Sequence, residues 1–145
     1  MPARARDKLE GDEVWSFGGK KTQKRGLWTA LGRRTRQSVA FVLGDPSART
    51  CRQLGRRIPP ADKRGRSFSE LWESYRQVFP RKTPRRVGKG NGEINHMERW
   101  NNTLRQRKAR SVRRTLAFAK SDFSHELVTR LFILRYNLVR RSCVI

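Results

Sequence analysis

Three short apolar runs near the N-terminus constrain the fold of this chain more than any other feature of its sequence. They cover Glu13–Gly18, Gly26–Leu31 and Ser38–Gly44, and they are rich in Trp, Phe, Val and Leu. The gaps between them contain basic residues with Gly, Ser or Thr, which are typical of turns. Because consecutive strands with short connections usually pair as antiparallel neighbours, the sequence predicts three antiparallel strands at the start of the fold.

A helix is expected after these strands. Ser47 can cap it, a proline directly before Ser47 suits a helix start, and the two prolines at 59–60 predict its end. Residues 67–79 mix strand and helix patterns, with room for a short strand before Ser69. Residues 80–95 contain two Pro and three Gly and predict a basic loop.

Two further helices are expected in the last third of the chain. The first runs from His96 to about Ala119 and carries many arginines. The second begins after a Ser-Asp pair at 121–122, which is a typical helix start. Its apolar residues recur on one side, which predicts that this side faces the core; they are Phe123, Leu127, Leu131 and Leu134.

This order of elements predicts an α/β fold. A chain of 145 residues suits one domain. We expect that domain to span residues 11–140, after a frayed basic tail at 1–10 and before a short tail at 141–145.

The charge indicates a polyanionic partner. The chain has 35 Lys and Arg against 12 Asp and Glu, which gives a formal net charge of +23. Nucleic acid is the favoured partner, and an anionic membrane surface is the alternative. We expect no membrane-spanning segment, because no stretch approaches the ~18 consecutive apolar residues that a bilayer requires. The N-terminus has no apolar segment of the kind found in secretory signals.

The cysteines and tryptophans favour structural roles. Cys51 and Cys143 match no zinc-ligand spacing, so free thiols in a reducing cytoplasm are expected. The chain has four Trp, which could stack on nucleic-acid bases. Their apolar surroundings favour core packing instead.

Two acidic positions could serve a metal-dependent reaction on phosphates, which needs several converging carboxylates. Asp12 precedes a strand run, and Glu13 would point to the opposite face; the alternative is a solvated acidic pair. Glu98 shares a predicted helix face with Asn102 and Arg105, which follow it by four and seven residues. The alternative is a surface acid paired with arginines, and spacing alone leaves both open.

Longer strings of the sequence resemble a known family. DEVWSFGGKKTQKRGLWTAL at 12–31 is similar to the opening strands of transposases of the insertion sequence one (IS-one) family, and HMERWNNTLRQRKARSVRRTLAFAKS at 96–121 is similar to their final catalytic helix. The resemblance covers roughly residues 10–140. It implies a ribonuclease-H-like fold and an Asp-Asp-Glu site. Such enzymes use Mg²⁺, for which Mn²⁺ can substitute, to cut transposon ends and join the 3′ hydroxyl to target DNA.

Carried over by position, the resemblance implies that Asp12, Glu70 and Glu98 are the catalytic metal ligands. Glu70 stands where the family has Asp, and its stem is one methylene longer. A displacement of about 1 Å in a catalytic group can cost on the order of 100-fold in rate, so weak or absent activity is expected. The DNA phosphates would be held by the basic and amide side chains of the last part of the chain, namely Asn102, Arg105, Arg107, Arg110 and Arg114.

The resemblance has further implications for partners. Members of the family carry an upstream zinc-binding and helix-turn-helix region, which this sequence does not show, so no zinc is expected in this chain. An oligomer assembled on DNA and a location in the bacterial cytoplasm, at the nucleoid, are expected. The main alternative is a non-catalytic basic DNA-binding protein derived from a decayed transposase. A small ribosomal or chromatin-type protein is less consistent with the tryptophan-rich strands.

Overall fold

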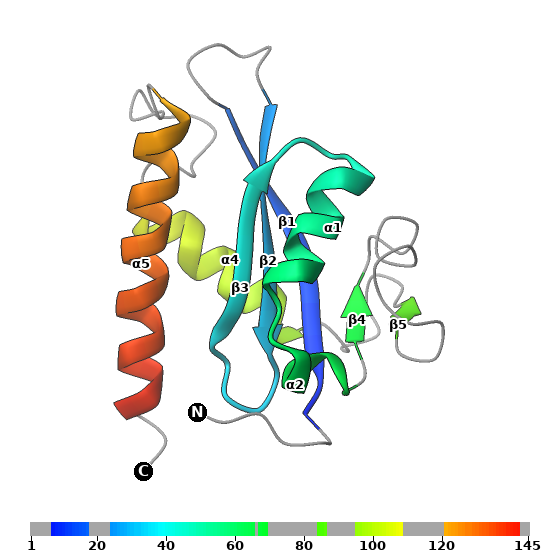
Figure 1. Ribbon diagram of the computed structural model, residues 1–145. Coiled ribbons are helices and arrows are strands. Elements are labelled where there is room, and N and C mark those ends of the chain that lie inside the picture. The colour runs from blue at the N-terminus through cyan, green and yellow to red at the C-terminus, as the bar shows by residue number, and fades with distance from the viewer. Residues whose placement is uncertain are drawn as a thin grey trace.

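The computed structural model describes residues 7–17, 24–65, 67–69, 84–86, 95–108 and 121–142. Their fold is α/β, with a five-stranded mixed sheet flanked by helices (Figure 1). The strand order is β3-β2-β1-β4-β5, so the first strand of the chain lies at the centre of the sheet.

The three predicted antiparallel strands are confirmed. They are β1 (Leu9–Phe17), β2 (Lys24–Gly32) and β3 (Ser38–Gly44), each antiparallel to the next. The short strands β4 (Ser67–Ser69) and β5 (Pro84–Arg86) continue the sheet, with β4 parallel to β1 and β5 parallel to β4.

Two of the predicted boundaries need correction. The tail predicted at 1–10 is too long, because β1 begins at Leu9 and both Leu9 and Glu10 are buried. The loop predicted at 80–95 contains β5, and the following helix begins at Asn95. Both errors arise because strand pairing adds order that the local sequence does not show: Leu9 and Glu10 pair with β2 and β4, and β5 pairs with β4.

The sheet has an apolar cluster on each face. One cluster joins Leu9, Trp28 and Val42 to Cys51 and Leu54 of α1 (Ala48–Arg57), which covers that face (Figure 1). As predicted, Ser47 caps α1: its Oγ accepts a hydrogen bond from the Thr50 backbone N at 3.3 Å. The first proline of the pair at 59–60 precedes the short helix α2 (Pro60–Lys63).

The opposite face carries the second cluster. It joins Val14, Leu27 and Leu31 of the sheet to residues of α4 (Asn95–Arg107) and α5 (Asp122–Ser142). Trp100 of α4 is almost fully buried there and lies edge-on to Tyr136 of α5, with 4.5 Å between ring centroids. The core role expected for tryptophan is therefore confirmed for Trp28 and Trp100, both about 1% exposed.

The predicted helix from His96 to Ala119 ends earlier than expected. α4 stops at Arg107, and Lys108 is a buried non-helical residue whose Nζ donates a hydrogen bond to Thr129 Oγ1 of α5. This tertiary contact lies at the point where the helix ends. Residues 109–120 lie outside the described residues.

The last helix begins as predicted but faces the other way. Ser121 Oγ accepts a hydrogen bond from Ser124 N at 3.1 Å, and α5 starts at Asp122. The apolar residues predicted to face the core are exposed instead; they are Phe123, Leu127, Leu131 and Leu134. The side that packs on the sheet is a different one, formed by residues such as Ile133 and Tyr136. Periodicity found an apolar face of α5, but α5 has two.

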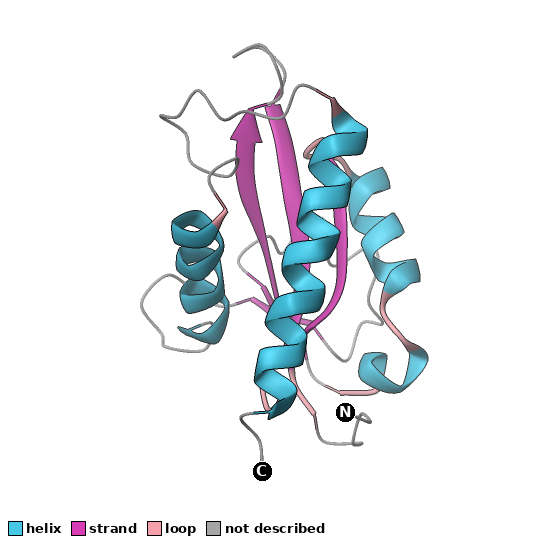
Figure 2. Cartoon of the chain, turned by 90° about the vertical axis from the view of Figure 1, so that its left-hand side faces the viewer, coloured by secondary structure: helices cyan, strands magenta, loops and turns pink. Residues whose placement is uncertain are grey.

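α5 lies along the edge strand β3 (Figure 2). The Asn137 side chain accepts from Ser38 N at 2.9 Å and donates to Ser38 O at 2.8 Å, so its amide pairs with the backbone as a neighbouring strand would. This contact closes part of the sheet edge and sets the position of α5.

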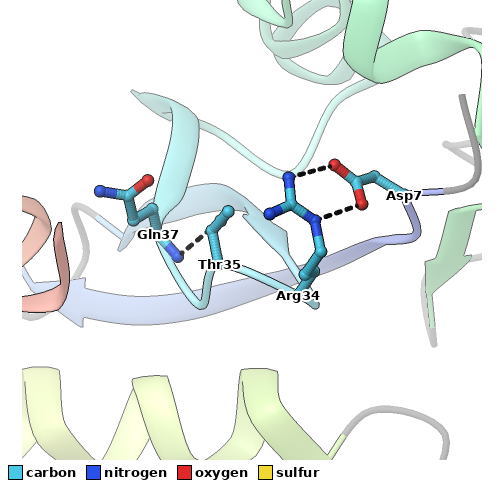
Figure 3. Close-up of polar contacts among 4 residues, drawn as sticks. All are labelled: Asp7, Arg34, Thr35 and Gln37. Carbon is cyan, nitrogen blue, oxygen red and sulfur yellow. Dashed lines mark hydrogen bonds and ion pairs between the residues drawn. The ribbon is translucent and has the colours of Figure 1, made fainter. Parts of the chain in front are cut away.

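A second polar contact fixes the start of β1. Two nitrogens of the Arg34 guanidinium donate hydrogen bonds to the Asp7 carboxylate: Nε to Oδ1 at 2.7 Å and Nη2 to Oδ2 at 2.8 Å (Figure 3). Arg34 lies in the β2–β3 turn, where Arg36 has a left-handed backbone with φ of 54° and Thr35 Oγ1 accepts from Gln37 N.

No helix in the described part of the chain is long and apolar enough to cross a membrane.

Candidate functional site

β1 carries three carboxylates within four residues, at Glu10, Asp12 and Glu13. Because side chains alternate along a strand, Glu10 and Asp12 point toward α4, whereas Glu13 points toward the α1 cluster. The opposite orientation predicted for Asp12 and Glu13 fits this arrangement. Glu13 is not a fully solvated acid, however, since it is half-buried and its Oε1 is buried close to Gly26.

Asp12 faces a polar residue of α4. Asn101 Nδ2 donates a hydrogen bond to Asp12 Oδ2 at 2.6 Å. The other end of that amide, Asn101 Oδ1, is buried and has no hydrogen-bond partner among the described residues. Thr29, which pairs with Asp12 across the β1–β2 ladder, also has a buried hydroxyl without a partner in the described part of the chain. Asp12 is therefore accompanied by two oxygen atoms whose hydrogen-bonding capacity is unused.

Glu98 lies on the neighbouring flank of α4. It precedes Asn101 by three residues, about one helical turn, and its side chain is exposed. Arg105 and Asn102 are also exposed on this side of the helix, as their spacing predicted. The structure thus places Asp12 against α4 one turn from Glu98.

Two titratable side chains on the α1 side of β1 are affected by burial. Burial, together with the smaller effect of the neighbouring charges of Asp12 and Asp45, raises the pKa of Glu13 to about 7. Burial likewise raises the pKa of the Cys51 thiol, to about 12, with a smaller contribution from Glu13. Cys51 is therefore an inert core thiol at neutral pH.

Comparisons with known proteins show the family to which this chain belongs. The sequence pattern of the family described as IS1 transposase matches residues 8–138. The chain belongs to the IS1 transposase family. It is 36% identical over 124 residues to the insertion element iso-IS1n protein InsB of Shigella dysenteriae, covering 86% of this chain and 92% of that protein. It is 31% identical over 123 residues to the insertion element IS1 4 protein InsB of Escherichia coli strain K12, covering 82% of this chain and 69% of that protein. No solved structure matches the chain.

Membership of the IS1 transposase family implies DNA as the partner. The three carboxylates that the resemblance implies as metal ligands are Asp12, Glu70 and Glu98. Asp12 and Glu98 occupy β1 and α4 as described above. Glu70 lies outside the described residues, as do Arg110 and Arg114. Within the described part of the chain, no group of three or more His, Cys, Asp or Glu residues is placed to hold a metal ion. The three-carboxylate site therefore stays a prediction.

Glu10 lies beside the candidate site and was not singled out from the sequence. Its side chain is fully buried, and its carboxylate accepts hydrogen bonds from Met97 N at 2.8 Å and Arg33 Nε at 2.7 Å. Met97 N is in the first turn of α4, where backbone N–H groups have no partner within the helix. Glu10 therefore caps α4 and holds it against β1. The signal available in the sequence was its position two residues before Asp12, on the same face of a strand.

Asn101 was also missed, because Asn102 was favoured by its spacing of four from Glu98. The buried face of α4 decides between them: Asn101 is 6% exposed and reaches Asp12, whereas Asn102 is exposed. Asn101 also lies within the string at 96–121 that resembles the family's catalytic helix, three residues after Glu98, and that string could have identified it.

A basic groove of about 710 Å³ lies between α4 and α5 of this transposase. Arg107, which was predicted to bind DNA, lines it together with two arginines of α5 that the sequence did not single out, Arg135 and Arg140. Arg140 donates to the Tyr136 hydroxyl at 3.2 Å and lies 5.3 Å from the centre of its ring. The groove is a surface on which phosphates could bind.

Proposed function

We propose that this chain is a catalytic transposase domain that cleaves DNA and transfers strands in a metal-dependent reaction on a ribonuclease-H-like fold. The observation that carries the proposal is the placement of Asp12, on the central strand of a mixed sheet, against α4 one turn from Glu98. These are two of the three carboxylates that the family resemblance implies. The antiparallel strands that open the sheet support the fold assignment.

The residues around Asp12 fit a magnesium ion. Mg²⁺ prefers oxygen ligands, and Asp12 lies beside the unused oxygens of Asn101 and Thr29. Asp12, Glu98 and Glu70 would hold the metal, and Mn²⁺ could replace Mg²⁺. When bound, such ions activate the attacking oxygen and stabilise the leaving oxygen in phosphoryl transfer.

The remaining residues act by positioning. Asn101 fixes the Asp12 carboxylate through its 2.6 Å hydrogen bond, and Glu10 fixes α4 through the cap at Met97. Exposed basic and amide side chains would hold DNA phosphates along the helix; those in the described residues are Asn102, Arg105 and Arg107. Arg110 and Arg114 are proposed for the same role.

Nicking of supercoiled plasmid in Mn²⁺ tests the proposal, because it requires no knowledge of the transposon ends. We expect Glu70→Asp to cut better than the parent chain and Glu98→Gln in that background to abolish cutting. Glu126→Gln is the matched control, since Glu126 is an exposed acid on α5 paired only loosely with Arg130. If the Glu70→Asp, Glu98→Gln double variant cut plasmid as well as Glu70→Asp alone, Glu98 would not be a catalytic metal ligand.

A second candidate function is DNA binding without catalysis. The net charge of +23 and the basic groove between α4 and α5 favour it. In that case plasmid would be bound in a salt-sensitive manner that metal does not change, and neither the parent nor Glu70→Asp would cut. We further propose that the chain acts in the bacterial cytoplasm, at the nucleoid, as an oligomer on DNA.

A further inference from the structure

The basic groove between α4 and α5 combines two kinds of side chain. Its cationic part consists of three arginines, and no acidic residue is among the described residues that line it. The arginines are Arg107 of α4 and Arg135 and Arg140 of α5. The apolar part of the groove is formed by Phe132, Tyr136 and Val139 of α5. Cationic groups and aromatic rings therefore line one volume of about 710 Å³.

α5 presents its groove residues on a single side of the helix. Phe132, Tyr136 and Val139 are separated by four and three residues, and an arginine stands next to each of the last two in the sequence. The rings of Phe132 and Tyr136 are only partly buried against the core, and they lie 25° from parallel with 6.4 Å between their centroids. Their remaining surface forms the wall of the groove.

We propose that the basic groove binds an unpaired stretch of DNA, with a base stacked on the aromatic wall and phosphates held by the arginines. Proteins that bind single strands combine a cationic groove along the backbone with aromatic rings on which bases stack. Arg140 suits both tasks, because its guanidinium lies 5.3 Å from the centre of the Tyr136 ring and such planar groups also stack on bases. The volume of the groove falls within the about 300–1,000 Å³ of sites for small ligands, so it accommodates a nucleotide.

The aromatic wall favours an unpaired strand over a duplex. A duplex keeps the faces of its bases stacked inside and presents phosphates and base edges to a protein. The arginines of the groove would bind either form of DNA, but Phe132 and Tyr136 can stack only on a base that has left its pair. The rings therefore predict a preference for single-stranded DNA that charge alone does not.

The groove lies on the flank of α4 that is turned away from Glu98. Each residue advances about 100° around a helix of 3.6 residues per turn. Thr103 and Arg107, which line the groove, follow Glu98 by five and nine residues and so lie about 140° and about 180° from it. The groove is therefore separate from the proposed metal ligands. The inference requires DNA as the partner but does not require metal-dependent cutting.

Binding measurements without divalent metal test the inference on the full chain. The probes are a fluorescently labelled oligo-dT of about ten nucleotides and a duplex of the same length. Tyr136→Leu removes the ring but keeps an apolar side chain beside Trp100. We expect it to weaken oligo-dT binding about five-fold or more, as for the loss of one base stack, and duplex binding less than two-fold. Unchanged oligo-dT binding by the folded variant would overturn the stacking.

Arg135→Gln tests the phosphate contacts. For single strands, the logarithm of the binding constant falls with the logarithm of the salt concentration by about 0.7 for each phosphate neutralised. Arg135→Gln should reduce this slope by about 0.7, whereas Tyr136→Leu should leave it unchanged. Arg52→Gln is the matched control, since it removes the same charge from an exposed position of α1, on the other face of the sheet. Equal losses of oligo-dT affinity in Arg135→Gln and Arg52→Gln would show that only overall charge matters and would overturn the groove assignment.

Photo-cross-linking tests the contact on the parent chain, and it decides the question if Tyr136→Leu does not fold. The probe is the same oligo-dT with one iodinated deoxyuridine, which cross-links on irradiation to an aromatic side chain that stacks on it. We expect mass spectrometry to place the cross-link on Phe132 or Tyr136. Cross-links found only outside α5 would overturn the inference. None of these measurements involves cutting, so their outcome is independent of whether the chain nicks plasmid.

Discussion

The cap that Glu10 provides to α4 should be a major contribution to stability, and replacing Glu10 by Ala tests it. The hydrogen bond from Met97 N to a charged acceptor contributes about 1.5–3 kcal/mol. The ion pair to Arg33 adds less, about 0.5–1 kcal/mol, because the Arg33 side chain is 22% exposed and water can replace its partner. We therefore expect Glu10→Ala to lower the free energy of unfolding by about 2–4 kcal/mol, a large share of a typical total of about 5–15 kcal/mol.

Glu10→Gln should cost about half as much as Glu10→Ala. The amide has nearly the same shape and keeps one oxygen that can accept from Met97 N, but it loses the charge that strengthens both hydrogen bonds. Urea denaturation of the parent and the two variants measures the difference, with the slope of each transition checked for constancy.

A matched control is available in the same chain. Glu126 pairs with Arg130 at 3.0 Å, but both side chains are exposed, at 41% and 59%. Glu126→Ala should therefore cost no more than about 0.5 kcal/mol. If Glu10→Ala and Glu126→Ala had equal effects, the argument that the buried carboxylate holds α4 in place would be refuted.

Three further predictions follow from buried polar groups. Because the pKa of Glu13 is raised from 4.5 to about 7, protonation of Glu13 stabilises the folded state, and this stabilisation is lost as the pH rises from 4.5 through 7. In urea titrations, Glu13→Gln should therefore gain stability relative to the parent between pH 5 and pH 8. An equal difference in stability at both pH values would contradict the burial of Glu13. Asn137→Ala should lower the free energy of unfolding by about 1–3 kcal/mol, because it removes the side chain that pairs with the N–H and C=O of Ser38. Hydrogen exchange of the Ser38 amide should become faster, and an unchanged exchange rate would exclude the docking of α5 on β3. In a Cys143→Ser background, Cys51 should resist alkylation at pH 8 until the protein is unfolded, because burial raises its pKa to about 12; rapid reaction of the folded protein would show that the α1 cluster is open.

Local patterns predicted the elements whose signals lie within a few residues. The three opening strands were identified from short apolar runs and turn chemistry, and Ser47 was identified as a cap from its position after a proline. The orientation of α5 was predicted wrongly because its sequence is apolar on two sides. Contacts with distant residues, such as that of Asn137 with Ser38, 99 residues away, decide which side packs on the sheet.

The candidate site was only partly predictable for the same reason. Family-like strings gave Asp12 and Glu98 as candidate ligands, a role that stays a prediction, and the strand period correctly placed Asp12 and Glu13 on opposite faces. The capping of α4 by Glu10 joins residues 87 apart in the sequence, and no local pattern contains it. The choice of Asn101 over Asn102 depends on which face of α4 is buried, which the arginine-rich sequence around it obscures.

The two contacts of β1 with α4 explain how a strand can set the position of a helix that carries a proposed ligand. Glu10 reaches Met97 and Asp12 reaches Asn101. Two residues along a strand advance about 6.8 Å, and four residues along a helix advance about 6 Å. The spacings agree, so both contacts form together, and sliding α4 along β1 by one turn would break both. The pair of contacts therefore fixes the height and rotation of α4, and with them the place of Glu98 relative to Asp12.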